Sequence, residues 1–511
     1  MGAPLRLRGR AAFPEALSSG SLHVCRSFGD DRAAPTGQNS GHRVWEREHV
    51  TRFLRSSALA ASSLAPTAGS FVAVRALDSS SGLAAVGFLA GLQVVAAVAT
   101  LLADMNIGPA GIRLLAQASD RDRVALITQL RAITLAGACV LGAVGALLSA
   151  AVGPMVLGPR AAWWSFGAAA LAGGFGMCAA QELNILTGLG KVWAVAISLG
   201  VQGLVGLASA LIVLTQQTRH AAEWYLLVST AAQIVTTMSI SKVAMRASRR
   251  SVRGSPDDRR SFRSQLAGIS RLLDGSVTTT SAVLLGAGSV ALAPLVVQWV
   301  AGYEAAGSFR VATMVATVAA AAFTPVIARV WFPLAATAPI DRLSAEARRH
   351  VRQSLLAAGS AVSVLALAAP AISRVLAGNT AQATSIRARL LVEVPRAIAL
   401  VYTYAVLARM PAKVFLRVEF CSAILLGCGV YVGARLAGAT GASIGLCAGV
   451  VAYGCIAFGV LRSSGRPWTV RRSSRETERS SEGQAASSAH VGVHEEPWPQ
   501  DRRSGVVFDA G

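Results

Sequence analysis

Residues 301–314 read AGYEAAGSFRVATM, a turn of small and polar residues with a glycine, placed between two long apolar runs. Residues 76–89 read ALDSSSGLAAVGFL and repeat the order of polar turn, glycine and apolar run. Gly82 and Gly307 lie 225 positions apart (307 minus 82). This recurrence predicts a chain built from two copies of one unit.

Composition indicates a membrane protein. The chain has 511 residues, of which 53% are apolar and 14% charged, and its mean hydropathy is +0.51. Soluble domains carry roughly 25% charged residues. Apolar runs of about 20 residues, the length that crosses a bilayer as a helix, recur along the chain. We therefore expect an all-α integral membrane protein.

Twelve apolar segments are predicted to be transmembrane helices. They lie near residues 53–74, 83–103, 132–153, 162–182, 192–214, 224–244, 273–299, 308–332, 354–376, 388–408, 414–434 and 440–461. The connections between them are short and leave no room for an extramembrane catalytic domain. The sequence therefore predicts a protein that is not an enzyme and that needs no cofactor or metal.

The polar stretches divide the chain. Residues 1–50 and 463–511 are polar and are predicted to be disordered cytoplasmic tails. A basic cytoplasmic linker is expected over 245–267, between six-helix lobes over 51–244 and 268–462.

Orientation follows from the basic residues of loops and helix ends, which favour the cytoplasmic side. With the N-terminus inside, twenty Lys and Arg residues fall on the inner side. Seven fall on the outer side, namely Arg75, Arg160, Arg219, Arg374, Arg387, Arg389 and Arg435. Both termini are therefore predicted to be cytoplasmic. The formal net charge of +22 is attributed to contact with anionic lipid, with no nucleic acid as a partner.

Two further landmarks support the internal repeat. Asp120-Arg121 aligns with Asp341-Arg342 at an offset of 221, and Lys191 aligns with Lys413 at an offset of 222. Six helices per copy is an even number, so the halves have the same topology. This arrangement is a parallel repeat about an axis along the membrane normal.

Charged residues in or beside apolar segments are candidates for a substrate site, because a charge near the bilayer centre costs about 2.5–3.5 kcal/mol. The candidates are two pairs at i,i+3 spacing, Arg271 with Asp274 and Glu393 with Arg396, and two arginines at segment starts, Arg55 and Arg310. One interpretation is a cationic cavity for a diphosphate head group. The other is that each pair neutralises itself and that the two remaining arginines extend to the membrane surface.

The glycines of the last helix and most of the cysteines are expected to serve helix packing. Gly441, Gly445 and Gly449 predict close helix packing on the last helix. Six of the seven cysteines lie in apolar segments without metal or disulfide spacing and are expected to be small core residues.

Three longer stretches resemble polysaccharide flippases of the multidrug/oligosaccharidyl-lipid/polysaccharide exporter superfamily. They are LDSSSGLAAVGFLAGLQVVAAVATLLADMNIGPAGIRLLAQ, QELNILTGLGKVWAVAI and VVQWVAGYEAAGSFRVATMVATVAAAAFTPVI. The resemblance covers about residues 51–462 and rests on their order and spacing. It implies two lobes around a central cavity, alternating access, and an isoprenoid-diphosphate-linked sugar as cargo. It also implies a plasma-membrane location, with membrane lipids and polysaccharide-assembly proteins as partners.

Two other functions remain open. A cation-coupled multidrug or small-solute antiporter of the same superfamily would need clustered carboxylates for H⁺ or Na⁺, whereas Asp104, Asp274, Glu393 and Glu419 are scattered in the sequence. A non-transporting membrane scaffold is the second alternative. The sequence names neither the sugar nor a coupling ion.

Overall fold

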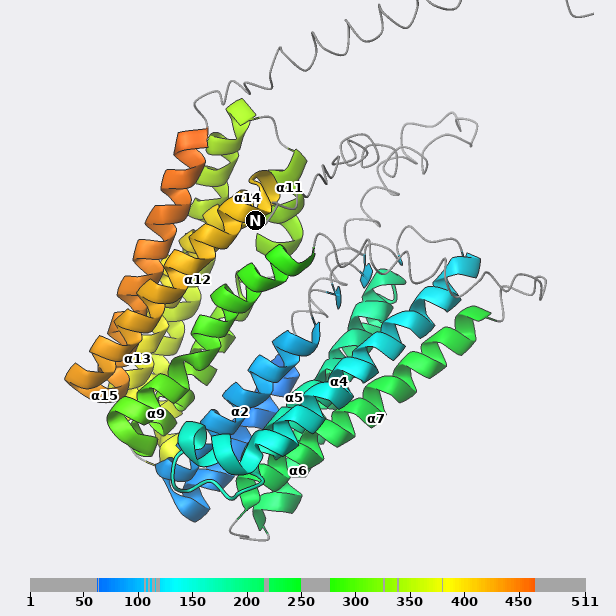
Figure 1. Ribbon diagram of the computed structural model, residues 1–511. Coiled ribbons are helices and arrows are strands. Elements are labelled where there is room, and N and C mark those ends of the chain that lie inside the picture. Colours follow the sequence, from blue (N-terminus) through cyan, green and yellow to red (C-terminus); the bar gives the residue numbers. More distant parts are fainter. Residues whose placement is uncertain are drawn as a thin grey trace, which may run out of the picture. The chain divides into compact units, whose positions relative to one another are not determined.

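Helices form all of the regular secondary structure in the part of the chain that the computed structural model describes (Figure 1). The described residues are 62, 64–104, 107–108, 111–112, 115, 120–215, 220–249, 276–324, 327–337, 340–378 and 380–464. Most of the two predicted tails and of the predicted linker lie outside these ranges. The all-α class is thus confirmed within them.

The helices follow one another with short connections. A helix over residues 64–81 precedes α2 (Leu83–Asp104), α4 (Asp120–Leu157), α5 (Ser165–Gly188), α6 (Val192–Thr215) and α7 (Ala221–Arg249). The later elements are α9 (Ser276–Ala321), the π-helix η2 (Ile327–Trp331), α11 (Phe332–Thr337), α12 (Ile340–Ala377), α13 (Ala383–Leu391), α14 (Glu393–Arg409) and α15 (Ala412–Ser464). Several of the connections turn at a glycine with positive φ, as at Gly82, Gly158, Gly190 and Gly378.

Two of the long helices contain a turn. Gly302 interrupts α9 with φ 87° and ψ 175°, and Ala437 and Gly438 interrupt α15. The two parts of α15 run back along each other, because a Cβ on Gly445 would overlap the carbonyl oxygen of Gly429. Division at these turns yields helical segments that follow the twelve predicted ones in order. The number of membrane crossings itself stays a prediction.

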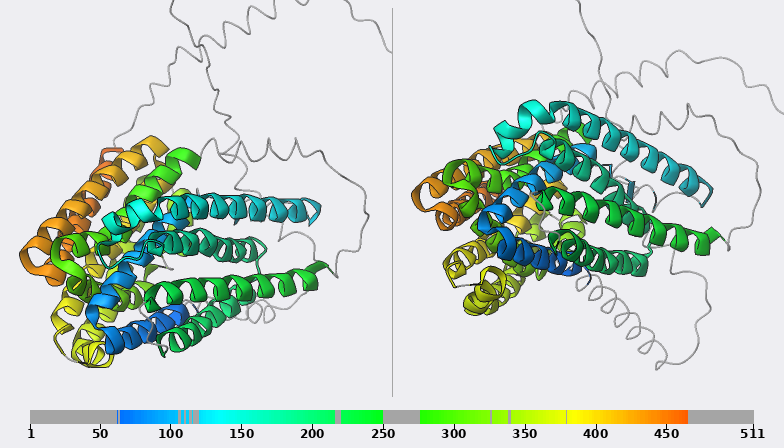
Figure 2. Two further views of the ribbon diagram at one scale, coloured as in Figure 1. Left: turned by 60° about the horizontal axis from the view of Figure 1, so that its bottom comes forward. Right: turned by 90° about the horizontal axis from the view of Figure 1, so that it is seen from below.

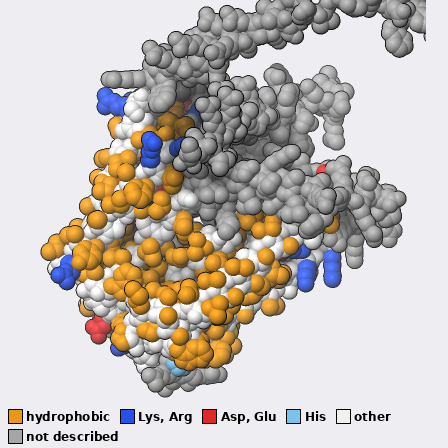
Figure 3. All heavy atoms as spheres, viewed as in Figure 1, with side chains coloured by type: hydrophobic (Ala, Val, Ile, Leu, Met, Phe, Trp, Pro, Cys, Tyr) orange, Lys and Arg blue, Asp and Glu red, His pale blue; other side chains and the backbone are white. Residues whose placement is uncertain are grey.

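The surface of the helices is apolar, as a membrane protein requires. Eight of the described helices are long and apolar enough to cross a bilayer. Large apolar side chains such as Leu147, Met155 and Leu367 are exposed. Figure 3 shows apolar side chains over most of the visible face of these helices, with Lys and Arg side chains at its margins. The chain is therefore an integral membrane protein.

Helix starts recur at a constant spacing. α12 begins at Ile340, 220 residues after the start of α4 at Asp120 (340 minus 120). α15 begins at Ala412, 220 residues after the start of α6 at Val192 (412 minus 192). The constant spacing agrees with two copies of one helix order. Both α4 and α12 begin about a dozen residues before the apolar runs predicted at 132 and 354, because their polar first turns continue the helix.

The opening glycine match needs a correction. Gly82 has φ 75° in the turn before α2, and the glycine with the same role in the second half is Gly302, with φ 87°. Gly307 lies inside α9, where a Cβ would overlap the carbonyl oxygen of Leu83. The sequence pattern could not separate a glycine needed for a turn from one needed for close helix contact, because both precede an apolar run.

The predicted glycine packing on the last helix is confirmed. A Cβ on Gly441 would overlap the carbonyl oxygen of Gly433, and a Cβ on Gly449 would lie 3.0 Å from the Cα atom of Leu426. The two parts of α15 therefore pack backbone to backbone.

Two groups of helices pack mainly among themselves. In one group, α4 to α7 contact one another and α2; in the other, α11 to α15 contact one another and α9. The views in Figures 1 and 2 agree with this grouping. The principal contact between the groups joins α2 to α9. There, a Cβ on Gly87 would overlap the carbonyl oxygen of Tyr303, so only glycine permits this approach.

Candidate functional site

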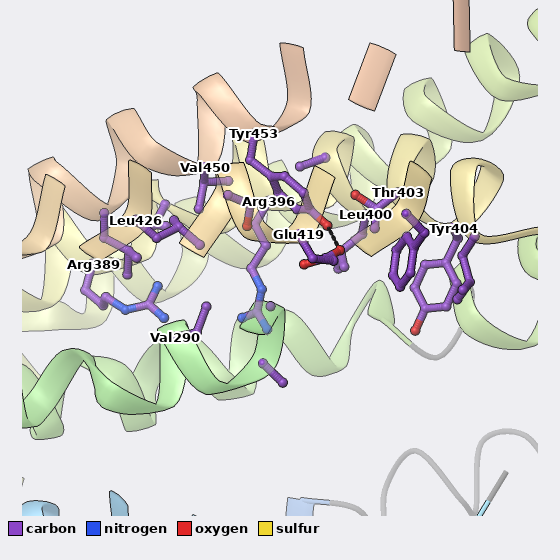
Figure 4. A pocket seen from close by; sticks show the side chains of 18 residues that line it. Val290, Arg389, Arg396, Leu400, Thr403, Tyr404, Glu419, Leu426, Val450 and Tyr453 are labelled. Atoms are coloured by element: carbon purple, nitrogen blue, oxygen red, sulfur yellow. Dashed lines mark hydrogen bonds between the residues drawn. The ribbon is translucent and has the colours of Figure 1, made fainter. Parts of the chain in front are cut away.

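A cavity of about 380 Å³ opens within the group formed by α9 and α11 to α15 (Figure 4). Its walls come from α9, α13, α14 and α15 and are mainly apolar, with side chains such as Val290 and Leu426. Three charged side chains also line it, namely those of Arg389, Arg396 and Glu419. Because charge is costly within a membrane, three charged groups around one apolar cavity indicate a functional site.

Arg389, Glu393 and Arg396 form an ion-paired triad on one face of α13 and α14. Val392 between the two helices keeps helical dihedral angles (φ −62°, ψ −31°), so positions i, i+4 and i+7 share that face. Arg389 Nη1 donates to Glu393 Oε1 at 2.6 Å, and Arg396 Nη1 donates to Glu393 Oε2 at 3.1 Å. One carboxylate shared by two guanidinium groups leaves one positive charge in excess.

The two arginines of the triad differ in accessibility. The side chains of Arg389 and Glu393 are 3% and 0% exposed, whereas that of Arg396 is 35% exposed. Figure 4 shows the Arg396 guanidinium extending toward α9. The Nε atom of Arg389 is buried and has no hydrogen-bond partner among the described residues. Arg389 therefore anchors the carboxylate, while Arg396 is the group that an anionic ligand can reach.

Glu419 is held on another wall of the same cavity. Tyr453 donates its hydroxyl hydrogen to Glu419 Oε1 at 2.5 Å (Figure 4), and the residue is only 4% exposed. A Cβ on Gly286 of α9 would overlap the carboxyl group, so the glycine provides its space. No ion pair involves Glu419 among the described residues. A buried carboxyl with a hydroxyl donor and no cation is suited to bind a proton or a small cation.

Arg310 lies where the two groups of helices meet. It belongs to α9, and its electrostatic neighbour is Tyr225 of α7. Its Nε atom is buried and, among the described residues, has no hydrogen-bond partner. No described carboxylate forms an ion pair with it. Arg310 therefore supplies a second positive charge, at the contact between the groups.

The structure describes some of the site residues predicted from the sequence and not others. The structure pairs Arg396 with Glu393, of which only Arg396 lines the cavity, whereas Arg55, Arg271 and Asp274 lie outside the described residues. Arg389, which is counted among the basic residues of the outer side, is buried in α13 rather than exposed at a helix end. The i, i+4, i+7 spacing of the triad was the signal that could have identified it.

A separate ion pair joins three helices of the first group. Arg131 of α4 donates to both carboxylate oxygens of Glu182 on α5, at 2.5 and 2.7 Å. Ser241 of α7 donates its hydroxyl hydrogen to Glu182 at 2.6 Å. One guanidinium group meets one carboxylate here, so little charge is left for a ligand.

Within the described ranges, no group of three or more His, Cys, Asp or Glu side chains is arranged to hold a metal ion. The expectation of core cysteines was wrong for the four that are exposed, which are Cys139, Cys421, Cys428 and Cys455. The reason is that a lipid-facing helix surface accepts small apolar residues as readily as a core does.

The sequence and the fold of the chain are similar to those of known membrane proteins. Residues 71–338 match the profile of the polysaccharide biosynthesis protein family. The fold is similar to the inward-facing conformation of a multidrug resistance MATE family transporter of the MOP superfamily, with a TM-score of 0.58 and 13% identity over 79% of this chain and 94% of that one. It is also similar to the lipid II flippase MurJ in an inward closed conformation, with a TM-score of 0.60 and 10% identity over 80% and 87%. No curated protein sequence matches the chain.

Proposed function

Because the chain belongs to the polysaccharide biosynthesis protein family, we propose that it is a flippase for an isoprenoid-diphosphate-linked oligosaccharide. Its MOP-superfamily fold is that of a membrane transporter. The oligosaccharide would serve the synthesis of a cell-surface polysaccharide. The work of the chain is then transport rather than catalysis.

The observation that carries this proposal is the excess positive charge of the triad at the cavity. Guanidinium groups match the geometry of phosphate oxygens and keep their charge in apolar surroundings. Arg396 is accessible to an anion, while Arg389 keeps Glu393 occupied. A diphosphate that contacts Arg396 therefore meets a cation that Glu393 neutralises only in part.

Arg310 adds a proposed contact for the diphosphate where the two groups of helices meet. A diphosphate carries several charged oxygens, and a positive charge at the contact with α7 would bind the same head group as it crosses. Alternating access would expose this region first to one side of the membrane and then to the other. The isoprenoid chain stays in the bilayer while the sugar passes through. Arg55, Arg271 and Asp274 remain part of the proposed site on the basis of the sequence.

The proposed location is the plasma membrane, with both termini in the cytoplasm. The loop-charge asymmetry of the sequence supports it. Reporter fusions after residues 250 and 470 test this orientation. An external position for either reporter would contradict it.

Transport of a labelled lipid-linked sugar in vesicles tests the function. Arg396→Ala removes a charged contact to the phosphate, worth about 1.5–3 kcal/mol, so we expect the rate to fall about 10- to 100-fold. Arg396→Lys should retain part of the activity, because it keeps the charge but loses the fork geometry. Arg417→Ala is the matched control, since Arg417 is exposed on α15 and does not line the cavity.

Protein levels and thermal stability must match across these variants. A wild-type rate in the double variant Arg271→Ala, Arg396→Ala would exclude the arginine site. The assignments of the family and of the fold would still hold.

A second candidate function rests on Glu419. Its buried carboxyl, hydrogen-bonded to Tyr453 in the same cavity, is the kind of group that a cation-coupled antiporter needs. This function predicts that vesicles with a pH or sodium gradient accumulate an organic cation without any lipid-linked sugar, and that Glu419→Gln abolishes the uptake. If uptake requires the lipid-linked sugar, Glu419 instead couples an ion to the flippase.

A further inference from the structure

A second cavity, of about 550 Å³, lies on the outer side of the α9–α15 contact. We call it the α9–α15 groove. It is lined by Val296, Trp299 and Val300 of α9 and by Gly427, Cys428, Tyr431, Val432 and Arg435 of α15. Its volume falls within the range of pockets that bind small ligands.

The walls of the α9–α15 groove are apolar and face outward. Trp299, Tyr431 and Val432 are all exposed. Below them, buried side chains such as Val297 and Val430 hold the two helices together. Because both helices are long and apolar enough to span the membrane, the groove opens toward lipid chains rather than toward water.

One end of the groove lies near the membrane surface. Arg435 is close to the turn at Ala437 and Gly438, and Trp299 is close to the turn at Gly302. The two turns lie at the same end, because a Cβ on Gly438 would be 3.9 Å from the Cβ atom of Ala305. Trp and Tyr are enriched at this depth, and Arg there reaches the level of the lipid phosphates.

We propose that the α9–α15 groove binds an anionic phospholipid of the bilayer, with its phosphate at Arg435 and one acyl chain along Tyr431 and Trp299. Arg435 is exposed and forms no ion pair within the described part of the chain. Gly427 leaves free space in the groove, since no atom lies within 4 Å of a Cβ built there. This site goes beyond the proposed function, because its ligand is a resident lipid and not the cargo.

The bound chain would support the contact between the two groups of helices. Trp299 Nε1 donates to the carbonyl oxygen of Val156 at the end of α4, at 2.8 Å. Gln298 Nε2 and the Tyr303 hydroxyl both donate to the carbonyl oxygen of Leu157, at 2.8 and 2.5 Å. A wall of the groove is therefore also part of the contact with α4. The lipid should raise the thermal stability of the protein as well as bind to it.

The test uses the full chain, purified and delipidated, with phosphatidylglycerol or phosphatidylcholine added. Native mass spectrometry counts the lipids retained, and a melting curve reports stability. We expect the wild type to retain phosphatidylglycerol in preference to phosphatidylcholine and to melt at a higher temperature with it. Arg435→Gln should weaken phosphatidylglycerol binding about fivefold and remove the preference.

A filled groove provides the sharper comparison. Gly427→Leu places a side chain in this free space and should abolish retention of the lipid. Gly459→Leu is the matched control, because Gly459 is exposed on the same helix with no atom within 4 Å of a Cβ. Equal retention by the Gly427→Leu and Gly459→Leu variants would overturn the proposal. Displacement of phosphatidylglycerol by an equimolar isoprenoid phosphate would also overturn it, because the groove would then belong to the cargo.

Size-exclusion chromatography shows whether the Gly427→Leu chain folds. If it does not fold, the decision rests on Arg435→Gln, whose side chain is exposed. Unchanged binding and selectivity in that variant would reject the site.

Discussion

Two of the buried ion clusters among the described residues, around Glu182 and around Glu393, differ in the number of arginines per carboxylate. Glu182 meets one arginine, which binds both of its oxygens, and Ser241 adds a hydrogen bond. Glu393 is shared by Arg389 and Arg396. A balanced cluster has no charge left for a ligand, whereas the triad keeps one positive charge. The stoichiometry thus separates a structural pair from a candidate binding site.

The helices that each cluster joins support the same distinction. Arg131, Glu182 and Ser241 come from α4, α5 and α7, so their contacts hold three helices together. The triad lies on a single face of the adjacent helices α13 and α14 and ties no distant helix to another. Its ion pairs therefore contribute little to the tertiary structure. This difference agrees with the ligand site proposed at the triad.

The largest expected effect on stability is that of Arg131→Ala. The substitution leaves the Glu182 carboxylate buried without its cation. Removal of one partner of a buried pair costs about 3–5 kcal/mol, and we expect about 3 kcal/mol because the Arg131 side chain is 32% exposed. The melting temperature in detergent measures this loss.

Two companion variants define the Arg131 experiment. Lys242→Ala, on an exposed residue next to Ser241, should leave the melting temperature unchanged. The double variant Arg131→Met, Glu182→Leu should recover much of the loss, because no uncompensated charge remains. A double variant as unstable as Arg131→Ala would show that the contact acts through packing rather than charge.

The triad should respond differently to the loss of its buried arginine. Arg389→Met leaves Glu393 with Arg396, so the carboxylate keeps a cation and the loss of stability should be about 1–3 kcal/mol. Transport should fall as well, because Arg396 is then fully engaged by Glu393 and attracts the diphosphate less. Parallel melting and vesicle assays measure both effects. Equal stability losses for Arg389→Met and Arg131→Ala would erase the distinction between the clusters.

Tyr453→Phe tests the hydrogen bond to the Glu419 carboxyl in the cavity. It removes the hydroxyl that donates to Glu419 and leaves a buried oxygen without this partner. An unsatisfied buried polar group costs about 1–3 kcal/mol, and the lower end is expected here because the carboxyl borders a cavity that can admit water. The melting temperature measures it, with Cys455→Ala, at an exposed position of the same helix outside both cavities, as the control. A neutral result would mean that Glu419 has other donors.

The sequence predicted the helices well and the site only in part. Long apolar runs identify membrane helices because the bilayer imposes their length. Arg396 and Glu393 could be paired from the sequence because three positions along a helix bring residues onto one face. Glu419 and Tyr453 lie 34 positions apart across the turn in α15, and no local pattern marks that contact.

Arg389 shows a different limit of sequence reasoning. The residues before it, NTAQATSIR, are mostly polar, and Arg389 was counted among the basic residues of the outer side. In the structure this stretch includes the first turns of α13, which are buried among α9, α12 and α15. Burial of a polar helix start depends on the neighbouring helices, which a hydropathy pattern does not contain.

The smallest expected effect is that of Ser241→Ala, and it tests how complete the balanced cluster is. The variant removes one hydrogen bond to Glu182, while both contacts from Arg131 remain. A hydrogen bond to a charged group is worth about 1.5–3 kcal/mol when its loss leaves the charge without a partner, but here the carboxylate stays paired, so we expect about 1 kcal/mol. Ser239→Ala on the exposed face of the same helix is the control. Transport should match the wild type, because the cluster only holds α4, α5 and α7 together. A fall in transport without a fall in melting temperature would mean that the Arg131–Glu182–Ser241 cluster takes part in the transport cycle, and the comparison with the triad would then fail.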